Sequence, residues 1–185
     1  GLDLAGTCLG VQKKEKIITG EEIVPGDRII GVPSSGIHSN GLTLARKVVE
    51  DCASYDTRLS NGKTLGEELL TPTRIYSEVL RVTEACTIHG MCHITGGGLL
   101  NFTRLTEYGF SITDPLPVPE IFTWLQENGE IGDVEMYRTF NMGMGYAFIA
   151  PAESVAVIQS IIPEARVVGE VTREPGVRLA GVEIR

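Results

Sequence analysis

Short apolar runs alternate with stretches of helical spacing along the whole chain, and this alternation is the strongest constraint on its fold. Strands are predicted over residues 2–11, 28–33, 87–94, 109–113, 143–150, 167–172 and 177–184. Helices are predicted over residues 41–52, 65–70, 72–85, 98–107, 120–128 and 153–162, with one or two helical turns at 133–137. Elements in this order predict an α/β (α+β) domain, in which a central mixed β-sheet is flanked by helices in three layers.

Composition and charge exclude several classes of protein. The chain has 185 residues, of which 42% are hydrophobic, so it resembles a globular domain rather than a disordered segment. Its formal net charge of −8 argues against binding to nucleic acid, and no apolar run is long enough to span a bilayer. We see no secretory signal, and the four cysteines do not form a disulfide framework. We expect a single domain over residues 1–185 in the reducing cytoplasm.

Residues 33–41, here called the first glycine loop, carry the clearest chemical signal. The loop follows a buried strand, precedes a helix, and holds two glycines, three serines, one asparagine and one histidine. Backbone N–H groups at the start of a helix lack intrahelical partners and attract anions. We therefore predict that the loop binds substrate or phosphate through Ser34, Ser35, Gly36, Ser39 and Asn40.

His38 is the candidate catalytic residue of this loop. We expect it to lie in the cleft and to orient or protonate a reacting group, because an imidazole pKa of about 6.5 suits that task. Two other interpretations stay open. Ser39 or Asn40 would serve only as a helix cap, although a cap needs one such residue rather than five. Alternatively, Ser34 or Ser35 would be a nucleophile with His38 as its base.

Two further segments have a related design. In the second glycine loop, residues 95–98, a strand leads through Thr95 into three glycines and then a helix, and we predict that Thr95, Gly96, Gly97 and Gly98 bind the ligand. The alternative is a tight turn packed on a neighbouring strand. Residues 135–145 end in a strand opened by Gly143 and Gly145, where something else can lie against the flat surface. Arg138 and Asn141 are the polar binding candidates there, and packing of a helix on the sheet is the equally weighted alternative.

A metal site is the remaining alternative to weigh. Cys86, His89, Cys92 and His93 are close together in the sequence, and such side chains are zinc ligands. On a strand, however, residues 86 and 92 share one face while 89 and 93 point to the other. We therefore predict buried cysteines and no metal bound by this chain.

Five motifs, in this order, resemble a known family. They are DLAG at residues 3–6, SSGIHSNG at 34–41, PTRIY at 72–76, HITGGG at 93–98 and MYRTFNMGMG at 136–145. Together they resemble the C-terminal domain of the phosphoribosylformylglycinamidine cyclo-ligase (aminoimidazole ribonucleotide synthetase) family. The resemblance covers essentially the whole chain, and the PTRIY and MYRTFN runs are its most specific parts. Pro33 and the pair Leu42 and Thr43 depart from the expected pattern but leave its polar atoms intact.

The resemblance implies a function in purine biosynthesis. Members use ATP and Mg²⁺ to activate the formyl amide oxygen of formylglycinamidine ribonucleotide. Ring closure then gives aminoimidazole ribonucleotide and releases phosphate. An N-terminal domain that is absent from this sequence would carry the metal ligands and much of the ATP site, and would form a homodimer. This chain would then be the substrate-side half of the enzyme and inactive alone.

Two other functions stay in competition. One is a stand-alone module that binds a phosphorylated metabolite, which the two glycine loops also suggest. A sibling ATP-dependent enzyme of the same superfamily is the other alternative, such as a selenophosphate synthetase, a thiamine-phosphate kinase or the amidotransferase that acts one step earlier. The MYRTFN run disfavours these siblings.

Overall fold

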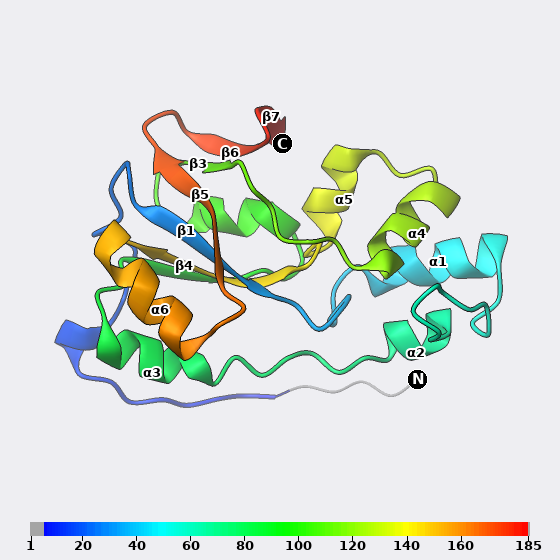
Figure 1. The fold of residues 1–185 in the computed structure, drawn as a ribbon, viewed down its shortest axis with the longest axis horizontal. Helices are drawn as coiled ribbons and strands as arrows, with labels where there is room; N and C mark the ends of the chain where they lie inside the picture. The colour runs from blue at the N-terminus through cyan, green and yellow to red at the C-terminus, as the bar shows by residue number, and fades with distance from the viewer. Residues whose placement is uncertain (1–5, 185) are drawn as a thin grey trace.

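A computed structural model describes residues 6–184, which are built around a seven-stranded β-sheet (Figure 1). The strands are β1 (Arg28–Pro33), β2 (Gly90–His93), β3 (Gly109–Ile112), β4 (Met144–Ala150), β5 (Arg166–Thr172), β6 (Gly176–Leu179) and β7 (Val182–Ile184). Their order in the sheet is β2-β4-β1-β5-β3-β6-β7. The pair β3 and β6 is parallel, and the other neighbouring pairs are antiparallel. The predicted mixed sheet is therefore confirmed.

Helices cover both faces of this sheet. They are α1 (Leu42–Cys52), α2 (Leu65–Leu69), α3 (Glu78–Ala85), α4 (Glu120–Asn128), α5 (Asp133–Thr139) and α6 (Val155–Ile161), with 3-10 helices η1 (Lys14–Lys16), η2 (Gly98–Arg104) and η3 (Ala152–Ser154). Successive strand residues point to opposite faces. Ile29 accordingly packs with Phe102 of η2, whereas Ile30 packs with Val82 of α3 and Ile158 of α6. These two cores make the three predicted layers.

A third core lies beyond one end of the sheet, where α1, α2 and α4 gather (Figure 1). Val49 of α1, Leu125 of α4 and Phe140 are fully buried in it. Ile37 of the first glycine loop is buried among them with no exposed surface. The loop is therefore anchored where the sheet meets this helical cluster.

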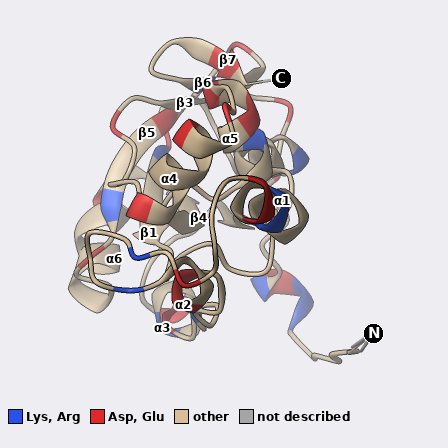
Figure 2. Ribbon diagram, turned by 90° about the vertical axis from the view of Figure 1, so that its right-hand side faces the viewer, with Lys and Arg blue, Asp and Glu red and all other residues tan. Residues whose placement is uncertain are grey.

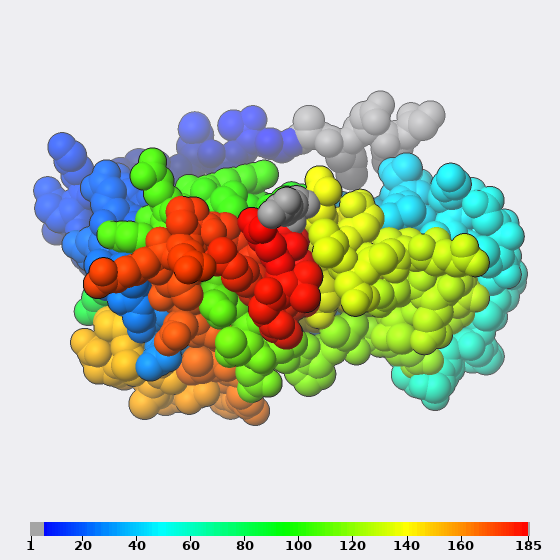
Figure 3. Space-filling model, turned by 90° about the horizontal axis from the view of Figure 1, so that it is seen from above, coloured from blue at the N-terminus to red at the C-terminus, as the bar shows by residue number. Residues whose placement is uncertain are grey.

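The start of the described chain is not a strand, so the prediction over residues 2–11 is wrong for residues 6–11; residues 2–5 lie outside the described part. Residues 6–13 form no regular element, and the segment runs along the border of the molecule (Figures 1 and 3). Leu9 is 93% exposed and Val11 is 104% exposed. A strand forms only where a neighbour completes its ladder of hydrogen bonds, and no described strand pairs with this segment.

The helix predicted over residues 72–85 begins only at Glu78. Residues 72–76 form no regular element, because tertiary hydrogen bonds hold them against the first glycine loop. The Ser35 hydroxyl donates to the Pro72 carbonyl over 2.7 Å and accepts from the Arg74 amide over 3.0 Å. The Tyr76 hydroxyl donates to the Pro33 carbonyl over 3.1 Å. These non-local bonds override the helical spacing of the segment.

Three smaller predictions also change in detail. The helix predicted over 98–107 is the 3-10 helix η2, and the one predicted over 153–162 starts as η3 before α6. The strand predicted over 177–184 is the hairpin of β6 and β7, in which Ala180 adopts a φ of 48°. The predicted elements at 28–33, 41–52 and 120–128 match β1, α1 and α4.

Candidate functional site

The first glycine loop is held in place by Asn141, a residue more than a hundred positions away in the sequence. The Asn141 side-chain amide donates to the Gly36 carbonyl over 2.8 Å. Its oxygen accepts from the Gly143 amide over 2.9 Å, and the Ser34 amide donates to the Gly143 carbonyl over 2.9 Å. Asn141 is 4% exposed. Both ends of its side chain are therefore occupied within the protein, so its direct contribution is to position the loop.

Ser35 and Ser39 also hold the first loop in position, through hydrogen bonds to residues 72–76. Besides the two hydrogen bonds of Ser35 to residues 72–76, the Ser39 hydroxyl lies 3.3 Å from that of Thr73. The alternative that Ser39 or Asn40 caps the following helix does not hold in the described chain. The residue before α1 is Gly41, and no side chain caps that end.

The second glycine loop lies against the first, although the two are more than fifty residues apart. A Cβ atom added to Gly96 would be 3.3 Å from the side-chain oxygen of Asn40. The side-chain amide of Asn101 stabilises the second loop by donating a hydrogen bond to the Gly98 carbonyl over 2.7 Å. Neither Gly96 nor Gly97 donates a backbone hydrogen bond to any group of residues 6–184. Their amides remain available to a ligand.

The third predicted segment, residues 135–145, contacts the second glycine loop through the backbone of α5. Gly98 has a φ of +52°, and a Cβ atom there would overlap the Tyr137 carbonyl oxygen and lie 3.0 Å from the Arg138 carbonyl carbon. Only glycine permits this approach of the two backbones. The Arg138 side chain is exposed and stands 4.0 Å from Glu135. The structure thus brings the three segments together, and the role of each side chain in binding stays a prediction.

His38 is buried rather than open to a cleft, which corrects the expectation about its surroundings. It is 4% exposed, and its Nε2 atom accepts a hydrogen bond from the Ser35 amide over 3.2 Å. Its Nδ1 atom is buried without a partner among the described residues. Burial, together with the nearby His93, lowers the pKa of His38 to about 4. The imidazole is therefore neutral at pH 7, so the expected pKa of an ordinary histidine does not apply.

His38 belongs to a cluster of four rings that sequence reasoning did not assemble, formed with Tyr76, His93 and Tyr146. The His38 ring centroid lies 6.2 Å from that of Tyr76 and 6.1 Å from that of His93. The centroids of Tyr76 and Tyr146 are 5.3 Å apart. The one sequence signal for this packing is Gly145, because a Cβ atom there would overlap the Tyr76 hydroxyl and lie 2.7 Å from the His38 ring.

The four residues considered as metal ligands have separate surroundings in the structure. The Nδ1 atom of His89 lies 2.7 Å from a carboxylate oxygen of buried Asp27, and Cys92 is buried in the core. Cys86 is half-buried and His93 joins the ring cluster. Among residues 6–184, no group of three or more His, Cys, Asp or Glu side chains is arranged to hold a metal ion.

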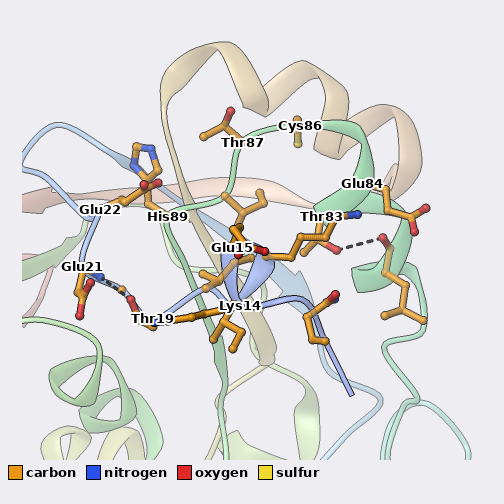
Figure 4. Close-up of a pocket in the computed structure, with 17 residues that line it drawn as sticks. Lys14, Glu15, Thr19, Glu21, Glu22, Thr83, Glu84, Cys86, Thr87 and His89 are labelled. Carbon is orange, nitrogen blue, oxygen red and sulfur yellow. Dashed lines mark hydrogen bonds between the residues drawn. The ribbon is translucent and has the colours of Figure 1, made fainter. Parts of the chain in front are cut away.

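One hollow lies away from the glycine loops. It has a volume of about 660 Å³ and lies between residues 12–22 and 80–89 (Figure 4). Its walls carry charges of both signs, including Lys14, Glu15 and Glu84. The glycine loops line no part of this hollow, so the hollow and the loop chemistry point to different places. We assign the candidate site by the loop chemistry.

Charges around the molecule are mixed in sign. In the view of Figure 2, Lys and Arg are spread among Asp and Glu over several elements. Arg74, beside the first loop, is paired with Glu78 over 2.8 Å and with Glu164 over 2.7 Å. It also lies 5.2 Å from the centre of the Tyr76 ring. Arg74 is therefore engaged within the protein. Arg138 is exposed, stands 4.0 Å from Glu135, and its backbone lies against Gly98 of the second loop.

Comparison with known proteins agrees with the motifs. The phosphoribosylformylglycinamidine cyclo-ligase of Methanosarcina barkeri is 49% identical over 191 residues, covering 100% of this chain and 56% of that protein. The enzyme of the same name from Thermococcus gammatolerans is 48% identical, with coverage of 100% and 56%. The chain spans about half the length of these relatives and matches their C-terminal part.

Solved structures show the same fold at low sequence identity. Thiamine monophosphate kinase from Aquifex aeolicus superposes with a TM-score of 0.57 at 18% identity, over 90% of this chain and 54% of the kinase. T. maritima PurL complexed with ATP gives a TM-score of 0.53 at 16% identity, over 90% of this chain and 25% of PurL. The family model described as "AIR synthase related protein, C-terminal domain" matches residues 24–182. The chain therefore belongs to the AIR synthase-related family and corresponds to its C-terminal domain.

Proposed function

We propose that this chain supplies half of the active site of an ATP-dependent phosphoribosylformylglycinamidine cyclo-ligase. The observation that carries the proposal is the identity of 48–49% over the whole chain to relatives of that name. The convergence of the two glycine loops supports it, because a ribonucleotide and ATP both present phosphate groups to be held. The amides of Gly96 and Gly97 would donate to phosphate oxygens, and Arg138 would add positive charge.

In this reaction, ATP transfers a phosphoryl group to the formyl amide oxygen of formylglycinamidine ribonucleotide. An amidine nitrogen of the same molecule then attacks the formyl carbon, and phosphate leaves as the imidazole ring closes. Phosphoryl transfer depends mainly on positioning and on charge stabilisation. In this proposal Ser34, Ser35, Gly36, Ser39 and Asn40 shape one wall of the substrate site, and Thr95, Gly96, Gly97 and Gly98 shape the other.

The remaining half of the site would come from a second domain. The relatives are nearly twice as long as this chain, and their N-terminal half has no counterpart in it. We propose that this half holds Mg²⁺ and much of ATP, as the resemblance to the cyclo-ligase family implies. Mg²⁺ would neutralise charge on the transferred phosphate. We also propose that the two-domain enzyme is a homodimer and works in the cytoplasm. None of the described helices has the length and apolar character needed to cross a bilayer.

The test is a fusion protein in which this chain follows the N-terminal half of the Methanosarcina barkeri relative. The fusion is mixed with ATP, Mg²⁺ and formylglycinamidine ribonucleotide, and formation of aminoimidazole ribonucleotide and ADP is measured. The chain alone is the control. We expect turnover by the fusion and none by the chain. Turnover by the chain at the rate of the fusion would refute a divided active site, and an inactive, folded fusion would refute the proposed reaction.

A further inference from the structure

The three histidines of the sequence differ in what their rings can reach. His38 is buried, and its Nε2 atom is already an acceptor for the Ser35 amide. His89 is held by Asp27 at 2.7 Å, beside the hollow that the glycine loops do not line. His93 is exposed, and within residues 6–184 no hydrogen bond or ion pair engages its imidazole. His93 is thus the histidine able to meet a bound molecule without rearrangement.

His93 stands between the two glycine loops. It is the last residue of β2, and the second loop begins two residues after it, at Thr95. Its ring lies 6.1 Å from the ring of His38, which belongs to the first loop. Its register partner on β4 is Tyr146, whose ring lies 6.0 Å away, and the Tyr76 ring lies at 5.6 Å. Both the edge of the sheet and the tyrosine rings therefore hold the imidazole at the junction of the loops.

The surroundings of His93 keep its imidazole neutral. Partial burial lowers its pKa, and no described carboxylate pairs with the ring to oppose this effect. The titratable groups that face it are His38, Tyr76 and Tyr146. Burial lowers the pKa of His38 and raises the pKa of both tyrosines, so all three are uncharged at pH 7. An exposed, neutral imidazole has a lone pair that can accept a proton.

We propose that His93 is a catalytic residue of the cyclisation and accepts the proton lost by the nitrogen that closes the ring. This inference rests on the proposed function. The attacking nitrogen forms a bond to the phosphorylated formyl carbon, and the carbon–oxygen bond breaks with its electron pair leaving on phosphate. The proton of that nitrogen passes to the imidazole lone pair and then to water. His38 becomes a positioning residue, because its Nε2 bond to Ser35 shapes the first loop.

The experiment compares the active fusion protein with its His93→Gln variant, and uses His89→Gln as the matched control. General base catalysis contributes roughly 10²–10⁴-fold. We expect His93→Gln to lower kcat at least about 100-fold, with His89→Gln close to the unchanged enzyme. Phosphoryl transfer precedes proton removal, so the variant should still form about one equivalent of ADP per site and then stall. The acidic limb of the kcat–pH profile should disappear with the imidazole.

Outcomes separate this inference from the proposed function. If the unchanged fusion makes no aminoimidazole ribonucleotide, the proposed function itself fails. If it is active and His93→Gln keeps its kcat, or loses the ADP burst together with ring closure, the role of His93 is wrong. A His93→Ala variant with a normal melting temperature adds a further measurement, in which added imidazole should restore turnover. Absence of rescue together with an unchanged pH profile would likewise overturn the proposal.

Discussion

Replacing Asn141 by alanine should loosen the first glycine loop and lower the stability of the chain. The change removes two buried hydrogen bonds, from the side-chain nitrogen to the Gly36 carbonyl at 2.8 Å and from the Gly143 amide to the side-chain oxygen at 2.9 Å. Each group left behind without a partner costs about 1–3 kcal/mol. The expected loss in the free energy of unfolding is therefore about 2–6 kcal/mol.

The measurement is urea unfolding of the 185-residue chain, followed by far-ultraviolet circular dichroism. In a thermal melt followed in the same way, a loss of about 4 kcal/mol should lower Tm by roughly 8–16 °C in a protein of this size. The denaturant slope should stay unchanged, because the same surface is exposed on unfolding. Such a loss is large for a single polar side chain.

The matched control is Asn128→Ala, which removes an exposed amide that donates to the Trp124 carbonyl over 2.9 Å. Water replaces that bond, so the expected loss is about 0.5 kcal/mol. Asn141→Asp keeps an acceptor for the Gly143 amide but places a carboxylate against the Gly36 carbonyl, and should be at least as destabilising as alanine. If Asn141→Ala costs no more than Asn128→Ala, Asn141 does not position the loop as argued.

Two further predictions concern the same region. Gly98→Ala should destabilise the chain by several kcal/mol more than Gly97→Ala, since both positions have positive φ but only the Gly98 Cβ would overlap the Tyr137 backbone; equal melting temperatures would contradict this packing. The second prediction is a fall in stability with decreasing pH. The folded pKa of His38 is about 4 against 6.5 in a model peptide, so between these values the unfolded chain binds a proton that the folded chain does not. Its contribution is complete above pH 6.5 and is lost as pH falls towards 4, by at most about 3 kcal/mol. Unfolding at pH 7 and pH 5 should show a smaller difference for His38→Gln, and an unchanged difference would mean that His38 titrates normally.

Local sequence patterns predicted an element correctly where burial of the element's own apolar face decides its structure. The apolar run at residues 28–33 and the helical spacing at 41–52 correspond to β1 and α1, because each buries the face that its own periodicity makes apolar. The prediction for residues 72–77 failed for the opposite reason. There the hydroxyls of Ser35 and Tyr76 form hydrogen bonds that compete with the helix, and both partners are distant in the sequence.

The candidate site was predictable in its parts but not in its assembly. Glycine and serine patterns placed both loops correctly between a strand and a helix. Their contact through Gly96 and Asn40 depends on sheet order, since β2 and β1 both flank β4. The same order sets His93 opposite Tyr146, and the rings of Tyr76 and His38 pack against Gly145. Only the glycine indicated that packing beforehand.

The sequence alone determined the family, the mixed α/β architecture and the two loops whose amides suit an anion, because motifs and periodicity are local properties. Only the tertiary structure decided which polar groups remain free. Asn141 and Ser35 hold the first loop through hydrogen bonds, whereas within residues 6–184 neither the Gly96 and Gly97 amides nor the His93 imidazole forms one. A side chain's exposure, partners and pKa are set by the residues packed against it, and most of those come from distant parts of the chain.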